Sequence, residues 1–148
     1  SLRAAMMEMS GGQEGVEIRA GSAHQLMQQA TAGVVASGTA TLEAAYYGLP
    51  HCLVYKVAWP TYLAGRMLVK IDCIGMANIL AGRMIAPEFI QHEATGEAMA
   101  SFLESVLGDE GRRVTMTHDL QAAASRLGEG EAAERAADAI CQLLGSDD

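Results

Sequence analysis

Basic residues, aromatic residues and cysteines are all scarce in this sequence, and each scarcity excludes a class of protein. Ten Lys and Arg against eighteen Asp and Glu give a formal net charge of −8. A nucleic-acid partner requires clustered cations that neutralise phosphates, so we expect none here. The three cysteines are widely spaced and odd in number, which argues against a disulfide framework and a cysteine-based zinc site. We expect no bound metal, and nothing in the sequence indicates a cofactor.

Long hydrophobic runs are missing as well. No apolar segment approaches the roughly 20 residues that span a bilayer, and the first residues do not resemble a secretory signal, so we expect a cytoplasmic protein. Half of the residues are nevertheless hydrophobic, which excludes a disordered chain. The 148 residues suffice for one domain with a core. Because the chain opens on Ser1 within a helical pattern, we expect a piece of a longer protein.

Helical and strand patterns alternate through the first half of the chain. Short apolar runs predict strands, apolar residues at 3-4 spacing predict helices, and Gly or Pro residues separate them. The expected elements are a helix at 2–9, a strand at Val16–Gly21, a helix at 23–30 behind a Ser22 cap, a strand at 33–37, a helix at 38–48 and a strand at 51–57. This order favours an α/β fold whose parallel strands are joined by right-handed crossovers.

The second half of the chain is mainly helical in pattern. A helix is expected at Trp59–Lys70, where core packing is the favoured role and contact with a membrane surface is the alternative. Residues 71–95 lack clean periodicity, and we interpret them as a structured loop with short pieces of helix or strand. Three amphipathic helices follow, the first of them behind a Thr95 cap.

The four histidines and the first cysteine have no spacing that indicates chemistry. His24, His51, His92 and His118 lie far apart in the sequence, and metal sites draw ligands from closer clusters. We interpret each histidine as a surface or supporting residue. Cys52 falls within an expected strand, where it would act as a small buried hydrophobic residue.

A strand runs directly into a helix at Ser37, Gly38, Thr39 and Ala40. Ligands of open α/β sheets bind at the carboxyl ends of strands, and free amides at a helix start favour an anion. Glu43 follows Thr39 by four residues and shares its helix face, so its carboxylate can accept hydrogen bonds from a ribose diol. This combination suits a nucleotide-sugar. The alternative is that Ser37 only caps the helix and Glu43 is solvated.

Three segments give the sequence a resemblance to a known enzyme family. They are "ASGTATLEAAYYGLP", "VYKVAWPTYLAGRMLVK" and "IGMANILAGRMIAPEFIQHEAT". The chain resembles lipid-A-disaccharide synthase, an inverting two-domain glycosyltransferase of the GT-B type with facing Rossmann-like halves. The resemblance implies a Rossmann-like parallel sheet flanked by helices, with further helices at the C-terminus. Residues 1–148 would be a partial C-terminal UDP-sugar-binding domain, without the N-terminal acceptor domain and without the first strands of this domain.

The activity that the resemblance implies is the transfer of an acylated glucosamine. Its donor is linked to UDP, its acceptor is a lipid monosaccharide phosphate, and the product is the β-1,6 disaccharide of lipid A biosynthesis. The general base is expected in the absent domain, so the catalytic residues are unknown and this chain is expected to be inactive alone. The resemblance also implies peripheral membrane contact at the inner face of the inner membrane, and a homodimer through the C-terminal helices. The alternatives are a non-catalytic nucleotide-sugar-binding fragment and an epimerase-like domain.

The resemblance further implies which residues contact the donor. Ser37 to Ala40 would face the diphosphate, and Glu43 would face the ribose. A second set would line the donor side of the cleft, namely Asn78, Arg83, Glu88 and Gln91. Arg83 would neutralise charge on the leaving UDP, a stabilisation that matters most in the transition state. One departure is Ala77, which stands where the family usually has Pro and therefore makes the loop less rigid.

Overall fold

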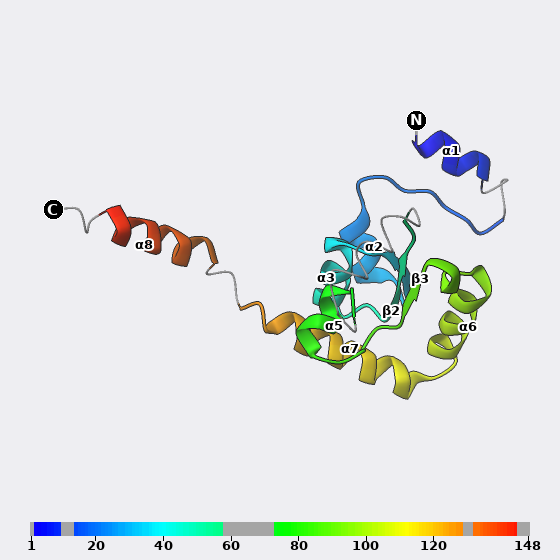
Figure 1. The fold of residues 1–148 in the computed structure, drawn as a ribbon. Helices are drawn as coiled ribbons and strands as arrows, with labels where there is room; N and C mark the ends of the chain where they lie inside the picture. The colour runs from blue at the N-terminus through cyan, green and yellow to red at the C-terminus, as the bar shows by residue number, and fades with distance from the viewer. Residues whose placement is uncertain (1, 10–13, 58–72, 129–131, 145–148) are drawn as a thin grey trace.

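A three-stranded parallel sheet lies at the centre of the computed structural model, which describes residues 2–9, 14–57, 73–128 and 132–144 (Figure 1). Its strands are β1 (Gly33–Ala36), β2 (His51–Tyr55) and β3 (Glu88–Ile90), in the order β1-β2-β3. Their register pairs Val34 with Cys52 and Val54 with Phe89. The predicted α/β fold with a parallel sheet flanked by helices is confirmed.

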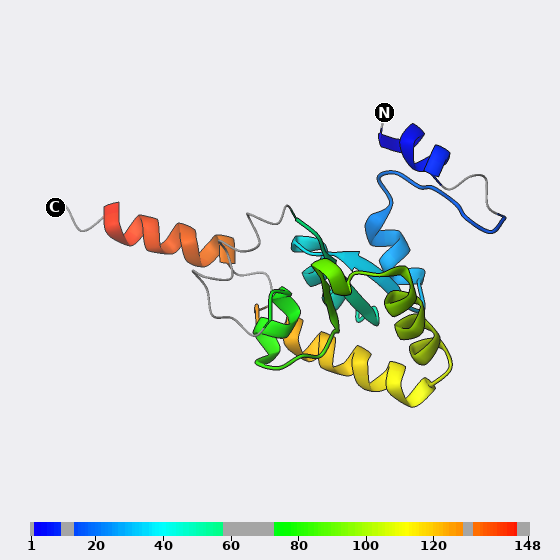
Figure 2. The ribbon, with the colours of Figure 1, turned by 45° about the vertical axis from the view of Figure 1, so that its right-hand side comes forward.

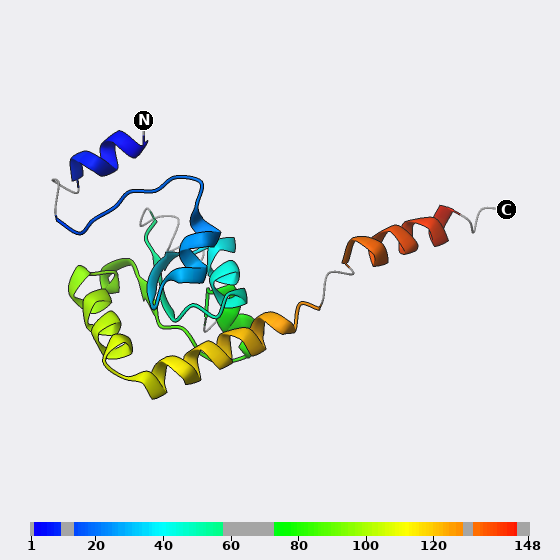
Figure 3. The same cartoon turned by 180° about the vertical axis from the view of Figure 1, so that it is seen from behind.

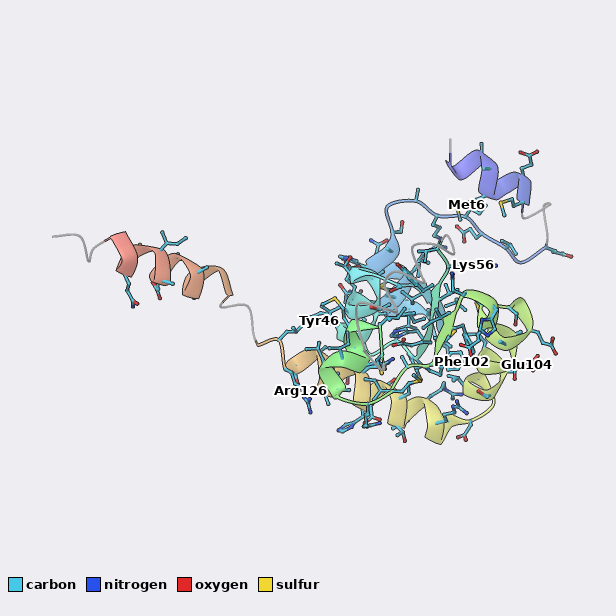
Figure 4. The ribbon with its side chains drawn as sticks, in the orientation of Figure 1. Met6, Tyr46, Lys56, Phe102, Glu104 and Arg126 are labelled. Atoms are coloured by element: carbon cyan, nitrogen blue, oxygen red, sulfur yellow. The ribbon has the colours of Figure 1, made fainter. Side chains whose placement is uncertain are left out.

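The described helices include some that pack on the sheet and two that extend away from it. They are α1 (Leu2–Met9), α2 (Ala23–Gln29), α3 (Thr39–Tyr46), α5 (Met76–Ala81), the 3-10 turn η1 (Gln91–Glu93), α6 (Gly96–Leu107), α7 (Glu110–Ser125) and α8 (Ala132–Leu144). The long helix α7 contacts α3, α5 and α6 (Figure 2). Arg126, just after α7, donates a hydrogen bond to Leu80 O and so joins α7 to α5 (Figure 4).

The core lies between the sheet and helices α3, α5, α6 and α7. Ala45, Cys52, Val106 and Leu120 are all 0% exposed and belong to one apolar cluster. Alanines on α3 leave room for the close approach of α7, and burying each larger aliphatic side chain contributes about 1.5–3 kcal/mol. The interpretation of Cys52 as a buried hydrophobic residue is confirmed.

One expected strand is absent. Residues Val16–Gly21 are irregular rather than a strand, so that prediction was wrong. A strand needs a neighbour for its backbone groups, and within the described segments no strand pairs with residues 16–21. Val16 is 54% exposed. An apolar residue becomes buried only where another element packs over it, and no such element covers Val16 among the described residues.

Two further predictions are confirmed. Residues 71–95 contain the short elements α5, β3 and η1, as expected for a structured loop with pieces of helix and strand. The Thr95 hydroxyl caps α6 and accepts a hydrogen bond from Ala98 N at 3.2 Å. Ser22 occupies the cap position of α2, but its side chain makes no capping bond. The expected helix at Trp59–Lys70 lies outside the described residues.

The first and last helices extend away from the sheet (Figures 1 and 3). Met9 of α1 is 86% exposed and Ile140 of α8 is 57% exposed, so these two side chains are not buried in the core. The three expected C-terminal helices are confirmed as α6, α7 and α8. Among the described helices none has the length and hydropathy of a bilayer-spanning segment.

Candidate functional site

The turn after β1 is open to solvent at the carboxyl-terminal edge of the sheet. Ser37 N donates to Val54 O at 2.9 Å, which continues the β1–β2 pairing by one residue. Gly38 then leaves the sheet with φ 140° and ψ −160°, a conformation that is accessible essentially to glycine alone. Gly38 and Thr39 are exposed, so a ligand can reach the backbone at this turn.

The start of α3 presents hydrogen-bond donors without internal acceptors. Thr41 donates to Gly38 O through both its backbone N at 3.2 Å and its hydroxyl at 2.7 Å. Thr39 N and Ala40 N have no acceptor within the described part of the chain, as expected for the first amides of a helix. These amides and the helix dipole favour a bound anion. The turn can therefore hold a phosphate despite the net negative charge of the chain.

Glu43 lies one turn further along α3, beside a histidine of α2. Its Oε2 is 3.2 Å from His24 Nε2, and the Glu43 side chain is 41% exposed. Tyr47 contacts the same His24 ring, with 5.9 Å between ring centroids. The interpretation of His24 as an isolated residue missed this pair, because 19 residues separate the two positions and no local pattern connects them.

A cavity of about 970 Å³ opens next to Glu43. One wall comes from α2 and α3 and the other from the end of α7, and the lining includes His24, Glu43, Tyr46, Gln121 and Gly128. Residues 37–40 do not line it. The structure thus places Thr39, Ala40 and Glu43 on one helix, with Ser37 and Gly38 just before it, and Glu43 lines a partly aromatic cavity.

Two residues of the second set lie together. Asn78 is 1% exposed and donates to Ala86 O at 2.7 Å and to Glu88 Oε1 at 2.8 Å. Its Oδ1 accepts from Ile85 N at 2.8 Å and from Ala86 N at 2.9 Å. Both donors and both lone pairs of this amide are used. Its predicted place on the donor side of a cleft stays a prediction, and any influence on a ligand would pass through the loop that it holds.

Gln91 and Arg83 lie at opposite ends of β3. Gln91 follows the strand, is 4% exposed, and bonds both backbone groups of Val57. Arg83 precedes the strand by five residues, and its Nη2 lies 2.6 Å from Asp119 Oδ2 of α7. The structure does not bring Arg83 to the turn at 37–40, and its contact with UDP stays a prediction.

Burial changes the chemistry of two neighbouring residues of β2. His51 is 1% exposed, so it is not a surface residue, and a supporting role stays a prediction. Burial lowers its pKa although the bond to Leu49 O acts in the other direction, and burial raises the pKa of the Cys52 thiol to about 11. Both groups are therefore neutral at physiological pH. Within the described ranges, no three His, Cys, Asp or Glu side chains gather so that they could hold a metal ion.

Comparison with known proteins adds evidence from the whole pattern of residues. The family model described as Lipid-A-disaccharide synthetase matches residues 13–142. The chain belongs to the lipid-A-disaccharide synthetase family. This confirms the resemblance inferred from the segments that begin at Ala36 and Ile74, and it places both the open turn and the second set within one family pattern.

Curated relatives carry the same description. The chain is 42% identical over 134 residues to "Lipid-A-disaccharide synthase" of Syntrophus aciditrophicus, covering 90% of this chain and 35% of that protein. It is 39% identical over 124 residues to the protein of the same name from Anaeromyxobacter dehalogenans, covering 84% of this chain and 32% of that protein. The Persephonella marina protein is 42% identical over 120 residues, with 81% and 32% covered. The chain therefore spans about a third of the length of these relatives.

Proposed function

We propose that this chain supplies donor-nucleotide binding to a glycosyltransferase of lipid A biosynthesis. The full protein would transfer an acylated glucosamine from a UDP-linked donor to a lipid monosaccharide phosphate, forming a β-1,6 disaccharide. Residues 1–148 would be part of its C-terminal UDP-sugar-binding domain, and the acceptor domain would lie elsewhere in the protein. Family membership supports this assignment. The observation that carries it is the exposed turn at Gly38, whose free amides stand one helical turn before Glu43.

The chemistry of this site follows from its donors and its one carboxylate. The amides of Thr39 and Ala40 would hold the diphosphate, with the dipole of α3 adding attraction. Glu43 would accept hydrogen bonds from the two ribose hydroxyls, and His24 at 3.2 Å would orient its carboxylate. As the glycosidic bond breaks, charge grows on the diphosphate, so fixed donors there stabilise the transition state more than the bound substrate.

Titration calorimetry with UDP tests this proposal. Glu43→Ala removes two hydrogen bonds to a charged acceptor, each worth about 1.5–3 kcal/mol, so we expect at least about tenfold weaker binding. The matched control is Glu104→Ala, an exposed glutamate on α6 across the sheet from Tyr46 of α3 (Figure 4). Equal affinity in the Glu43→Ala and Glu104→Ala proteins would refute the ribose role. Absence of UDP binding by the unmodified chain would refute nucleotide binding by this chain.

We further propose that α8 mediates association of two copies of the chain. The helix extends from the body, and Ile140 on it is 57% exposed, so this side chain needs a partner to be buried. Light scattering should show a mass that rises towards a dimer with concentration, and Ile140→Asp should keep the mass at that of one chain. A constant monomer mass in the unmodified chain would contradict the proposal.

Membrane contact is proposed at the inner face of the inner membrane, where a cytoplasmic enzyme would meet a lipid acceptor. The helix expected to make this contact, Trp59–Lys70, lies outside the described residues. Its basic residues provide the test, because electrostatic attraction to anionic lipid contributes about 1 kcal/mol per Lys or Arg. The double substitution Arg66→Glu and Lys70→Glu should release the chain from anionic vesicles in co-sedimentation. Unchanged sedimentation would contradict the proposed membrane contact.

A further inference from the structure

Two side chains of the β3 segment bind backbone groups at the two ends of the connection between β2 and α5. Gln91 binds Val57, the last described residue after β2. Glu88 binds Ile74 and Gly75, which lead into α5. The bonded partners are 34 and 13–14 residues away in sequence, so these contacts join segments that only the tertiary fold brings together.

The Gln91 amide imitates a peptide group. Its Oε1 accepts from Val57 N at 2.8 Å, and its Nε2 donates to Val57 O at 2.9 Å. Both backbone groups of Val57 are thereby satisfied two residues beyond the end of β2. Gln91 itself has φ 52°, a left-handed conformation that is uncommon outside glycine. Such strain persists where the surrounding contacts require it, and here the two bonds to Val57 are the contacts that do so.

The Glu88 carboxylate, which comes from β3, binds the backbone amides just before helix α5. It accepts from Ile74 N at 2.9 Å, from Gly75 N at 2.8 Å and from Asn78 Nδ2 at 2.8 Å. Gly75 is the cap residue of α5 and makes no side-chain cap bond, and the Glu88 carboxylate places a favourable negative charge beside the helix start. A Cβ on Gly75 would lie 3.0 Å from Glu88 Oε1 and 2.9 Å from Leu53 Cδ1. Only glycine leaves the carboxylate room to approach.

We propose that Glu88 and Gln91 are positioning residues that fix the backbone where it leaves β2 and where it enters α5. Their described polar contacts are backbone groups and, for Glu88, also the side chain of Asn78. This inference rests on the proposed function in one respect: the fixed residue Val57 lies three residues after Val54, whose carbonyl holds the nucleotide turn through Ser37 N. The turn has that bond independently of Gln91, so losing the Gln91 contact should free Val57 and leave the Ser37–Val54 bond in place.

Amide hydrogen exchange followed by NMR tests the two contacts separately. Gln91→Met keeps the length of the side chain and removes both bonds, so exchange at Val57 N should accelerate at least tenfold while exchange at Ile74 N and Gly75 N stays the same. Glu88→Met should accelerate exchange at Ile74 N and Gly75 N and leave Val57 N unchanged. A general loss of structure would instead accelerate all three amides together. Glu97→Met, an exposed glutamate in the first turn of α6, is the matched control.

UDP affinity provides the second measurement. We expect the Glu97→Met control to bind UDP as the unmodified chain does. Unchanged exchange at Val57 N in the Gln91→Met protein, together with a tenfold loss of its UDP affinity, would overturn the inference in favour of direct ligand contact. If the unmodified chain binds no UDP, the proposed function fails, while the exchange rates still decide the positioning role. If Glu88→Met does not fold, Glu88→Gln replaces it, because the glutamine keeps one acceptor and should accelerate exchange less.

Discussion

The turn at 37–43 and the segment at 78–91 are both parts of one family pattern, yet they use their polar groups in opposite ways. Around the turn, Thr39 N and Ala40 N donate to nothing in the described chain, and Glu43 is 41% exposed. In the second segment, Asn78 is 1% exposed and Gln91 is 4% exposed, and both bond the backbone of the chain itself.

This is the difference expected between residues that bind a ligand and residues that hold the fold together. A ligand needs donors and acceptors that the protein has left free, whereas a buried polar group must find partners in the fold because an unmade bond costs about 1–3 kcal/mol. The turn at 37–43 has free donors, as a ligand requires, and the segment at 78–91 has buried polar groups that are bonded within the fold. Substitutions in the second segment should therefore affect stability, and substitutions in the first should affect binding.

The largest expected effect is a loss of stability on substitution in the segment at 78–91. Asn78→Ala leaves the backbone groups of Ile85 and Ala86 without partners in a buried site. We expect the free energy of unfolding to fall by about 3 kcal/mol or more, measured by urea denaturation. Ile79→Ala is the control, because Ile79 is the next residue of α5 and is 54% exposed; its cost should be below about 1 kcal/mol. Equal losses for the two variants would contradict the architectural role of Asn78.

A smaller effect is expected at the turn. Gly38→Ala forces a side chain into a backbone conformation at φ 140°, which costs about 1–3 kcal/mol, and it should weaken UDP binding because the strained turn relaxes. Gly96→Ala is the control: Gly96 lies in the first turn of α6, with no atom within 4 Å of an added Cβ, so it should raise stability slightly. A Gly38→Ala protein with unchanged stability would show that the turn tolerates a side chain.

The His51 ring is buried with a hydrogen-bond partner for one of its two nitrogens, so its effect on stability can be tested through pH. Its Nδ1 bonds Leu49 O at 2.8 Å, and its Nε2 has no partner in the described structure. Because its pKa is lowered below the ordinary 6.5 in the folded chain, the unfolded chain binds a proton at higher pH. The stability that neutral His51 contributes is thus complete above pH 6.5 and is lost as the pH falls.

The corresponding measurement is the free energy of unfolding between pH 5 and pH 8. His51→Asn retains a donor towards Leu49 O and cannot titrate, so its stability should fall less steeply with acid than that of the unmodified chain. Parallel pH profiles in the two proteins would show that His51 is protonated without cost in the folded state.

The smallest expected effect concerns Arg83. Its pair with Asp119 is partly exposed, with the Arg83 side chain 60% and the Asp119 side chain 22% exposed, and such pairs contribute about 0–1 kcal/mol. Arg83→Gln should lower stability by less than about 1 kcal/mol and leave UDP affinity unchanged as long as the Arg83 guanidinium pairs with Asp119. A tenfold loss of UDP affinity in calorimetry would instead place the Arg83 guanidinium at the diphosphate and narrow the difference between the two segments.

Local sequence determined the elements of this protein and the shape of its turn. Apolar spacing, glycines and caps such as Thr95 act between residues a few positions apart, so the alternation of helices and strands and the open conformation at Gly38 were predictable. The strand expected at Val16–Gly21 failed for the same reason, because its apolar pattern says nothing about whether a partner strand lies beside it.

Only the tertiary structure decided which polar side chains remain available. The pairs His24–Glu43, Glu88–Gly75 and Gln91–Val57 join positions 13 to 34 residues apart, beyond the reach of any local pattern. A motif residue looks the same in sequence whether its hydrogen bonds are free or used. The packing of β3 against β2 and α5 uses those of Asn78, Glu88 and Gln91, whereas the start of α3 keeps its amides open because a first helical turn has no preceding carbonyls to accept them.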